Sequence, residues 1–258
     1  LTFKGICTGD DVFHYDVTQN IIKRGSMSMP EGKYDLDKHK WLGVFMARGR
    51  NGKIYLTLGP GLSVAAVPLG FVGTVLEKIA DVTAYRQMME KAREKGDVVS
   101  MLFYLRKLPS AFLAGLVNPI AMALTVLIFF NFCNMMTHSP HRSLSTSILF
   151  GTGTIIWPYS STFWTQPIVT FCLFCAFYCL LLYRKRPKPV FLFLAGTLLG
   201  YSVITRYDSA IFAPWFVLYI IFLHRRDRKE IPHVLASFIW PLIFFFLLQI
   251  GWNFYRFG

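Results

Sequence analysis

The feature that most constrains this chain is the near-continuous apolar character of the sequence after residue 108. Apolar runs occupy about 109–135, 145–160, 163–183, 190–205, 208–223 and 234–254. A helix needs about 20 apolar residues to cross a bilayer, although about 17 suffice, so the first, third and last runs are long enough. The whole chain is 54% hydrophobic and only 16% charged, which is typical of integral membrane proteins. We therefore expect an all-α membrane protein, with the short runs buried by neighbouring helices.

Basic residues are concentrated in short segments between these runs. Two of them read RKRPK (184–188) and RRDRK (225–229), and a third, MTHSPHRSL (136–144), carries an arginine. The positive-inside rule assigns such loops to the cytoplasmic side. The net charge of +13 by itself suggests nucleic acid, but this distribution favours a membrane orientation, so we expect membrane lipids and not nucleic acid as partners.

With these loops inside, successive crossings leave the residues before the first span on the outer face. The sequence thus predicts two parts: a first extracytoplasmic loop with juxtamembrane helices over 1–108, and a bundle of about six transmembrane helices over 109–258. Glycines and prolines in 56–76 predict a segment that lies in or dips into the outer interface. The segment 77–107 has an apolar stripe at helical spacing, and it either lies on the membrane or packs against the outer domain. The glycines of FGTGT (150–154) and LAGTLLG (194–200) predict close helix packing.

The outer part begins with an acidic stretch, TGDDVFHYD (8–16). Asp10 and Asp11 are adjacent carboxylates near the predicted membrane surface. Carboxylates in that position suit proton transfer or the binding of a divalent cation such as Mg²⁺ or Mn²⁺. The alternative is structural, because an aspartate just before VFHYDVTQNIIK is also a helix N-cap signal.

Four stretches together resemble the GT-C superfamily of integral-membrane glycosyltransferases, in particular the phospholipid-carrier-dependent, dolichyl-phosphate-mannose mannosyltransferase-like proteins. They are TGDDVFHYDVTQNIIKRGSMSM, GKIYLTLGPGLSVAAVPLGFVG, LFGTGTIIWPYSSTFWTQPIVTFCLFCAFYCLL and WNFYRFG. The resemblance implies a multi-pass enzyme of the bacterial inner membrane that is active on the extracytoplasmic side. It also implies a polyprenyl-phosphate-linked sugar donor, a glycan, lipid or protein acceptor, and further helices before and after this chain.

The resemblance places the catalytic acid in the first outer loop, where Asp10 is the first candidate and Asp11 the second. His14 and Tyr15 follow in the same stretch as candidate substrate-binding residues. An acceptor hydroxyl must lose its proton during attack, which requires a base, whereas a phosphate is already a good leaving group.

Other candidate substrate-binding residues are scattered along the chain. Arg206 is the first candidate for the lipid phosphate, since a guanidinium matches phosphate oxygens, and Asp208 lies beside it; the alternative is a local ion pair. Lys53 is a weaker phosphate candidate. Tyr55 suits stacking on a sugar, although interfacial aromatic residues are common in membrane proteins.

Two other functions compete with the transferase interpretation. A transporter or flippase explains the spans but leaves the acidic outer loop without a role, and it predicts inverted repeats that this sequence does not display. A membrane scaffold without catalytic activity is the second alternative. The transferase is distinguished from both if Asp10 faces a cavity together with Arg206, and not if Asp10 points into bulk solvent as a plain helix cap.

Overall fold

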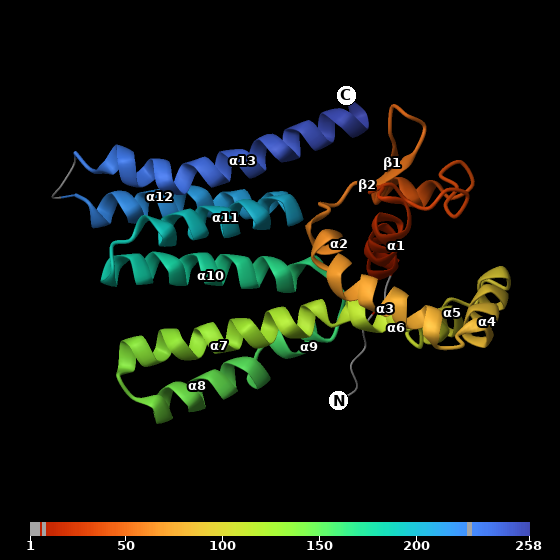
Figure 1. Cartoon of the computed structure of the whole chain (residues 1–258), viewed down its shortest axis with the longest axis horizontal. Helices are drawn as coiled ribbons and strands as arrows, with labels where there is room; N and C mark the ends of the chain where they lie inside the picture. Colours follow the sequence, from red (N-terminus) through yellow and green to blue (C-terminus); the bar gives the residue numbers. More distant parts are fainter. Residues whose placement is uncertain (1–5, 7–8, 226–228) are drawn as a thin grey trace. The chain divides into compact units, whose positions relative to one another are not determined.

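The computed structural model describes Ile6 and residues 9–225 and 229–258, and it divides into two compact units (Figure 1). Unit 1 comprises Leu1–Ala121 and Ile155–Trp164, and unit 2 comprises Met122–Thr154 and Thr165–Gly258. The domain boundary expected at residue 108 thus lies inside unit 1. The unit extends further because the helix that follows residue 108 packs on an earlier helix of the same unit.

Unit 1 is mainly helical. Its elements are α1 (Gly9–Arg24), the 3₁₀ helix η1 (Lys40–Val44), β1 (Met46–Arg48), β2 (Ile54–Leu56), α2 (Gly61–Ala65), α3 (Val67–Ile79), α4 (Thr83–Glu94), α5 (Val98–Leu105), α6 (Pro109–Gly115), the first turn of α7 (Val117–Thr137) and α9 (Ile156–Ser160).

A small antiparallel hairpin is the exception to the all-α expectation. Strands β1 and β2 pair with Ala47 opposite Tyr55. The turn contains Asn51 and Gly52, and Gly52 adopts a positive φ of 77°, a conformation that glycine reaches without strain. Asn-Gly is a strong hairpin signal, so this hairpin could have been predicted from the sequence.

Helix α1 is the centre of unit 1, because every residue from Asp11 to Asn20 is buried. Phe13 and Val17 contribute its apolar contacts. They belong to a cluster that also contains Met29, Leu42, Met46 and Leu56. The remaining buried side chains of α1 are largely polar, and the hydrogen bonds described below offset the cost of removing them from water.

Close packing of α3 against α6 explains why the glycine-rich segment 56–76 is helical. A Cβ added at Gly73 would lie 2.5 Å from the carbonyl oxygen of Pro109 and from the Cα of Ser110. Only glycine permits this approach of two backbones. Segment 56–76 therefore forms α2 and most of α3, and neither helix has the length and composition of a candidate span among the described residues.

The segment 77–107 forms two helices, α4 and α5, beyond the end of α3. Helix α4 ends before Gly96, which has a φ of +70°, and α5 begins after Asp97, whose side chain accepts a hydrogen bond from the Ser100 N–H at 3.1 Å. In the predicted apolar stripe, Val82 and Ala92 are buried whereas Tyr85 and Met88 are exposed. One edge of α4 therefore packs within unit 1 and the other faces outward.

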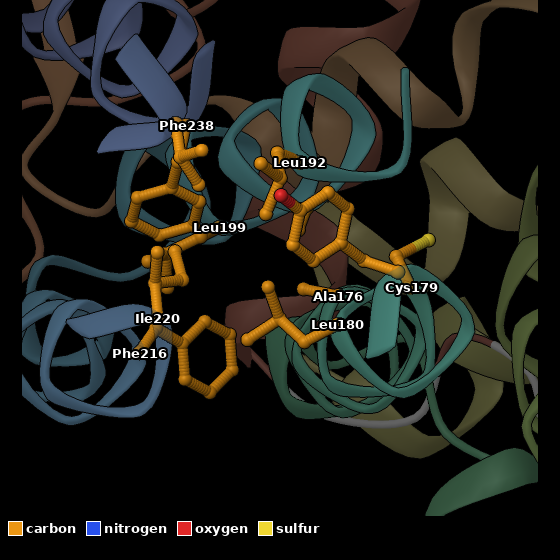
Figure 2. Close-up of a cluster of buried hydrophobic side chains, with 11 residues drawn as sticks. Ala176, Cys179, Leu180, Leu192, Leu199, Phe216, Ile220 and Phe238 are labelled. Atoms are coloured by element: carbon orange, nitrogen blue, oxygen red, sulfur yellow. The ribbon is translucent and has the colours of Figure 1, made fainter. Parts of the chain in front are cut away.

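Unit 2 is an all-helical bundle. Its elements are the remainder of α7, α8 (Pro140–Gly153), α10 (Thr165–Lys185), α11 (Pro189–Thr205), the 3₁₀ helix η2 (Tyr207–Ile211), α12 (Phe212–Leu223) and α13 (Ile231–Phe257). Figure 2 shows its core, where Leu180 of α10, Leu199 of α11, Ile220 of α12 and Phe238 of α13 come together. All four side chains are fully buried.

Among the described residues, three helical segments are long and apolar enough to cross a membrane: Pro109–Thr137, Thr165–Lys185 and Ile231–Phe257. They correspond to the three runs that the sequence marked as long enough. Pro189–Thr205 and Tyr207–Leu223 are shorter apolar helices. The run at 145–160 is not one helix, because α8 ends at Gly153 and α9 begins at Ile156. Membrane association is thus supported, while a bundle of about six crossings remains a proposal.

The basic loops of unit 2 share one end of the bundle. Figure 1 shows the α7–α8 and α10–α11 connections at the same end as the C-terminus of α12 and the N-terminus of α13. These positions carry Arg142, Arg184, Lys185, Arg186, Lys188, Arg225 and Lys229. The unit therefore has a strongly basic end, as the positive-inside rule requires of cytoplasmic loops.

Candidate functional site

Asp10 and Asp11 lie in the first turn of α1, where carboxylates interact favourably with the helix dipole. Their environments differ sharply: Asp10 is partly exposed, whereas Asp11 is completely buried. Because the helix begins at Gly9, neither aspartate occupies the N-cap position, which falls outside the described residues. Of the two carboxylates, only that of Asp10 is open to a substrate in this conformation.

Burial raises the pKa of Asp10 above its ordinary value of 3.8. A carboxylate with a raised pKa is a better proton acceptor, because base strength increases with pKa. Ile6, which precedes α1, is held by Arg106, whose Nε donates to the Ile6 carbonyl oxygen at 2.9 Å. Asp10 is therefore a partly desolvated carboxylate at the start of a rigidly held helix.

His14 lies one turn after Asp10 and is almost completely buried. Its Nδ1 is hydrogen-bonded to the Ser63 hydroxyl at 3.0 Å, while Nε2 has no hydrogen-bond partner within the described part of the chain. The Ser63 hydroxyl also donates to the His14 carbonyl oxygen at 3.1 Å, so α1 and α2 are joined at this point. Burial lowers the pKa of His14 to about 4, and the ring is neutral at physiological pH.

The depressed pKa makes His14 a source of acid instability. The unfolded state binds a proton near the ordinary pKa of 6.5 and the folded state only near 4, so stability is full above pH 6.5 and is lost as pH falls toward 4. The expected loss in the free energy of unfolding is about 3 kcal/mol once the pH has fallen below both pKa values. Thermal unfolding in detergent at pH 7 and pH 4.5 should show most of this loss in the wild type. His14→Asn should reduce the pH dependence, and a control at the exposed His39, His39→Asn, should leave it unchanged; equal pH dependence in all three would contradict this role.

The tyrosines predicted to bind substrate are internal residues. The Tyr15 hydroxyl is hydrogen-bonded to the Ser110 hydroxyl at 2.6 Å, which ties α1 to α6. Tyr55 is 2% exposed, and its hydroxyl accepts a hydrogen bond from Asn51 Nδ2 at 2.8 Å. Lys53, in the hairpin turn, is exposed. The ring of Tyr55 is not presented for stacking on a sugar in this conformation, whereas Lys53 is accessible.

Arg206 and Asp208 belong to unit 2, at the junction of α11 and η2. The guanidinium binds the carboxylate through two nitrogens, with Nε–Oδ1 at 3.1 Å and Nη2–Oδ2 at 2.8 Å. This is the local ion pair given above as the structural alternative. The pair is partly exposed and fixes the orientation of the arginine fork.

A divalent cation held by Asp10 and Asp11 together does not fit this geometry. Successive residues of a helix project about 100° apart, and neighbouring side chains do not face each other. Within the described residues, no group of three or more histidine, cysteine or acidic side chains is placed to hold a metal ion. No step below depends on one.

Sequence reasoning missed two buried carboxylates with fixed cationic partners. Asp16 is bound by the Lys33 ammonium, with Nζ–Oδ1 at 2.6 Å, and by the Tyr34 hydroxyl. Glu77 is bound by Arg86 Nη2 at 2.6 Å and by the Ser110 N–H at 2.9 Å. Asp16 belonged to the acidic stretch already singled out, but nothing in its local sequence indicates a partner 17 residues away.

Comparison of the chain with protein-family models, with curated proteins and with solved structures found no match. The resemblance to GT-C enzymes therefore depends on the four quoted stretches. Function is inferred below from the geometry of α1 and from the membrane character of the helices.

Proposed function

We propose that this chain is part of a membrane glycosyltransferase that moves a sugar from a polyprenyl-phosphate carrier to an acceptor hydroxyl. Asp10 acts as the base. The observation that carries this proposal is the contrast within the acidic pair: Asp10 is partly exposed with a raised pKa, on a helix whose next ten residues are all buried.

The proposed reaction is a single displacement at the anomeric carbon. The acceptor oxygen forms a bond to that carbon while the bond from the carbon to the phosphate oxygen breaks. Polyprenyl phosphate leaves with the electron pair, and the acceptor proton passes to the Asp10 carboxylate. General-base catalysis of this kind contributes about 10²- to 10⁴-fold to the rate, and one displacement inverts the anomeric configuration.

Hydrogen bonds that hold α1 in place also keep Asp10 in a fixed position for proton transfer. Hydrogen bonds from His14 to Ser63 and from Tyr15 to Ser110 connect α1 to α2 and α6. A base must stay within hydrogen-bond reach of the proton that it accepts, so these links favour catalysis. In this proposal His14 and Tyr15 position Asp10 through the helix, while Lys53 of the same unit stays a candidate for the donor phosphate.

The charge distribution of unit 2 supports an extracytoplasmic reaction. Its basic loops share one end of the bundle, and the positive-inside rule assigns that end to the cytoplasm. The opposite end then faces the periplasmic side of a bacterial inner membrane. The acceptor in this compartment would be a glycan, a lipid or a protein.

Vesicles containing the full protein test the function against its main rival. A polyprenyl-phosphate donor whose sugar is radiolabelled is incorporated into the vesicles. The label is then measured in the donor and in the product. A transferase releases unlabelled polyprenyl phosphate and labels an acceptor. Movement of intact donor between leaflets without release of polyprenyl phosphate would instead identify a flippase, and it would overturn the proposal.

A further inference from the structure

A cavity of about 370 Å³ lies within unit 1, beside α1. It is lined from α1 by residues that recur every three or four positions: Val12, Tyr15, Asp16, Gln19, Asn20, Lys23 and Arg24. At about 100° per residue, Asp10 projects from the opposite side of the helix and is not among the lining residues. The volume is within the range of small-molecule sites. The cavity is thus separate from the carboxylate assigned to catalysis.

The described lining is more basic than acidic. It contains the basic residues Lys23, Arg24, Lys33, Arg86 and Arg93 and the acidic residues Asp16, Glu77 and Glu90. The two buried acids are already occupied by the bonds described above: Asp16 by Lys33 and Tyr34, and Glu77 by Arg86 and the Ser110 N–H. These pairs engage Lys33 and Arg86, so the other cations of the cavity share no buried carboxylate; the third acid of the lining, Glu90, is exposed.

Lys23, Arg24 and Arg93 are those cations, and all three side chains are exposed. Lys23 and Arg93 carry the argument below, and neither forms an ion pair with any residue that the structure describes. Arg93 Nη2 donates to the Lys33 carbonyl oxygen at 3.0 Å, which holds the guanidinium in place and leaves most of its five N–H donors for another acceptor. The pKa of Lys23 lies below its ordinary value, first because the surroundings partly exclude water and second because Arg86 is nearby. A bound anion would oppose this shift, because it stabilises the charged ammonium.

The remaining wall is apolar. Met89 and Met101 line the cavity together with Leu105 and Leu108. A simple inorganic anion gains no favourable contact with this apolar surface, whereas the organic group of an organic anion would bury it. Arginine and lysine together suit phosphate, since the guanidinium fork matches its oxygens and the ammonium supplies a compact charge.

We infer that this cavity binds a small phosphate monoester. Lys23 and Arg93 hold the phosphate, and the organic part lies against Met89, Met101 and Leu105. Such an ester can come from solution, as a sugar phosphate, or from a lipid head group. The inference goes beyond the proposed transferase and does not depend on it, because the residues of the site do not include Asp10.

Binding to the purified full protein tests this site without any assay of catalysis. Isothermal titration calorimetry at constant ionic strength would compare glucose 6-phosphate with glucose. We expect the phosphate ester to bind and glucose to bind at least about tenfold more weakly, the difference produced by one charge-assisted hydrogen bond. The source of the ligand is identified by repeating the glucose 6-phosphate titration in nanodiscs that contain phosphatidic acid and in nanodiscs of phosphatidylcholine alone. Weaker binding of glucose 6-phosphate in the presence of phosphatidic acid indicates a lipid head group. Equal binding in both nanodiscs indicates a soluble ester.

Matched lysine variants locate the site. Lys23→Met should weaken binding of glucose 6-phosphate at least about tenfold, and Lys91→Met, at an exposed lysine of α4 outside the cavity, should not. Lys23 makes no hydrogen bond or ion pair with the described residues, so its replacement should leave the fold intact, and Arg93→Gln provides a second test. Equal affinity for glucose and its phosphate, or unchanged binding in both cavity variants, would overturn the inference.

Discussion

Asp10→Asn should reduce sugar transfer by about 10²- to 10⁴-fold, the usual contribution of a general base. Asparagine has nearly the same shape as aspartate but does not accept the acceptor proton. Because Asp10 is partly exposed, the variant should fold normally and keep its affinity for the donor. The measurement is the transfer rate in membranes at matched expression.

Two controls accompany this variant. Asp37→Asn replaces an exposed aspartate of unit 1 and should transfer sugar at the wild-type rate. The pH dependence is the second control: the carboxylate form is active and the pKa of Asp10 is raised, so wild-type activity should rise with pH through a value above 3.8. An Asp10→Asn variant with wild-type activity would remove Asp10 from the mechanism.

Gly196→Ala should destabilise unit 2 by about 1–3 kcal/mol or more, the range for overpacked cores. A Cβ at residue 196 of α11 would overlap the carbonyl oxygen of Phe238 in α13 and would lie 2.8 Å from Pro241 Cγ. Backbone atoms cannot rotate away, so the two helices must separate. The loss should exceed the gain of about 0.5–1 kcal/mol that alanine gives in a helix interior.

Gly251→Ala is the matched control, because Gly251 lies in α13 and a Cβ there meets nothing within 4 Å. Thermal unfolding in detergent would follow both variants. We expect a lower midpoint for Gly196→Ala and an unchanged or slightly higher midpoint for Gly251→Ala. Equal midpoints for the two variants would show that α11 and α13 are not packed as closely as described.

Features encoded over short distances could be predicted from the sequence. The three longest apolar runs coincide with the three candidate spans, since length and hydropathy are local properties. The predicted close packing at LAGTLLG is confirmed, because Gly196 and Gly200 both approach α13, with an added Cβ at Gly200 only 2.6 Å from Phe245 Cδ2. The predicted packing at FGTGT is confirmed more modestly, by Gly151 against Val126 of α7.

Features that depend on distant partners could not be predicted in the same way. Gly73 was one of the glycines in 56–76 that predicted an interfacial segment, but its role depends on close contact with the Ser110 backbone, far along the chain. The difference between Asp10 and Asp11 arises from their directions on α1, and neither local charge nor hydropathy encodes it. The cavity combines Lys23 of α1 with Arg93 of α4, and their juxtaposition depends on how those helices pack.

The most direct measurement for the central claim is the anomeric configuration of the product. The purified full protein would receive a polyprenyl-phosphate sugar of known configuration together with an acceptor, and NMR would determine the configuration of the new glycosidic bond. A single displacement assisted by Asp10 predicts transfer with inversion. Transfer with retention, or no transfer from any polyprenyl-phosphate sugar, would contradict the account.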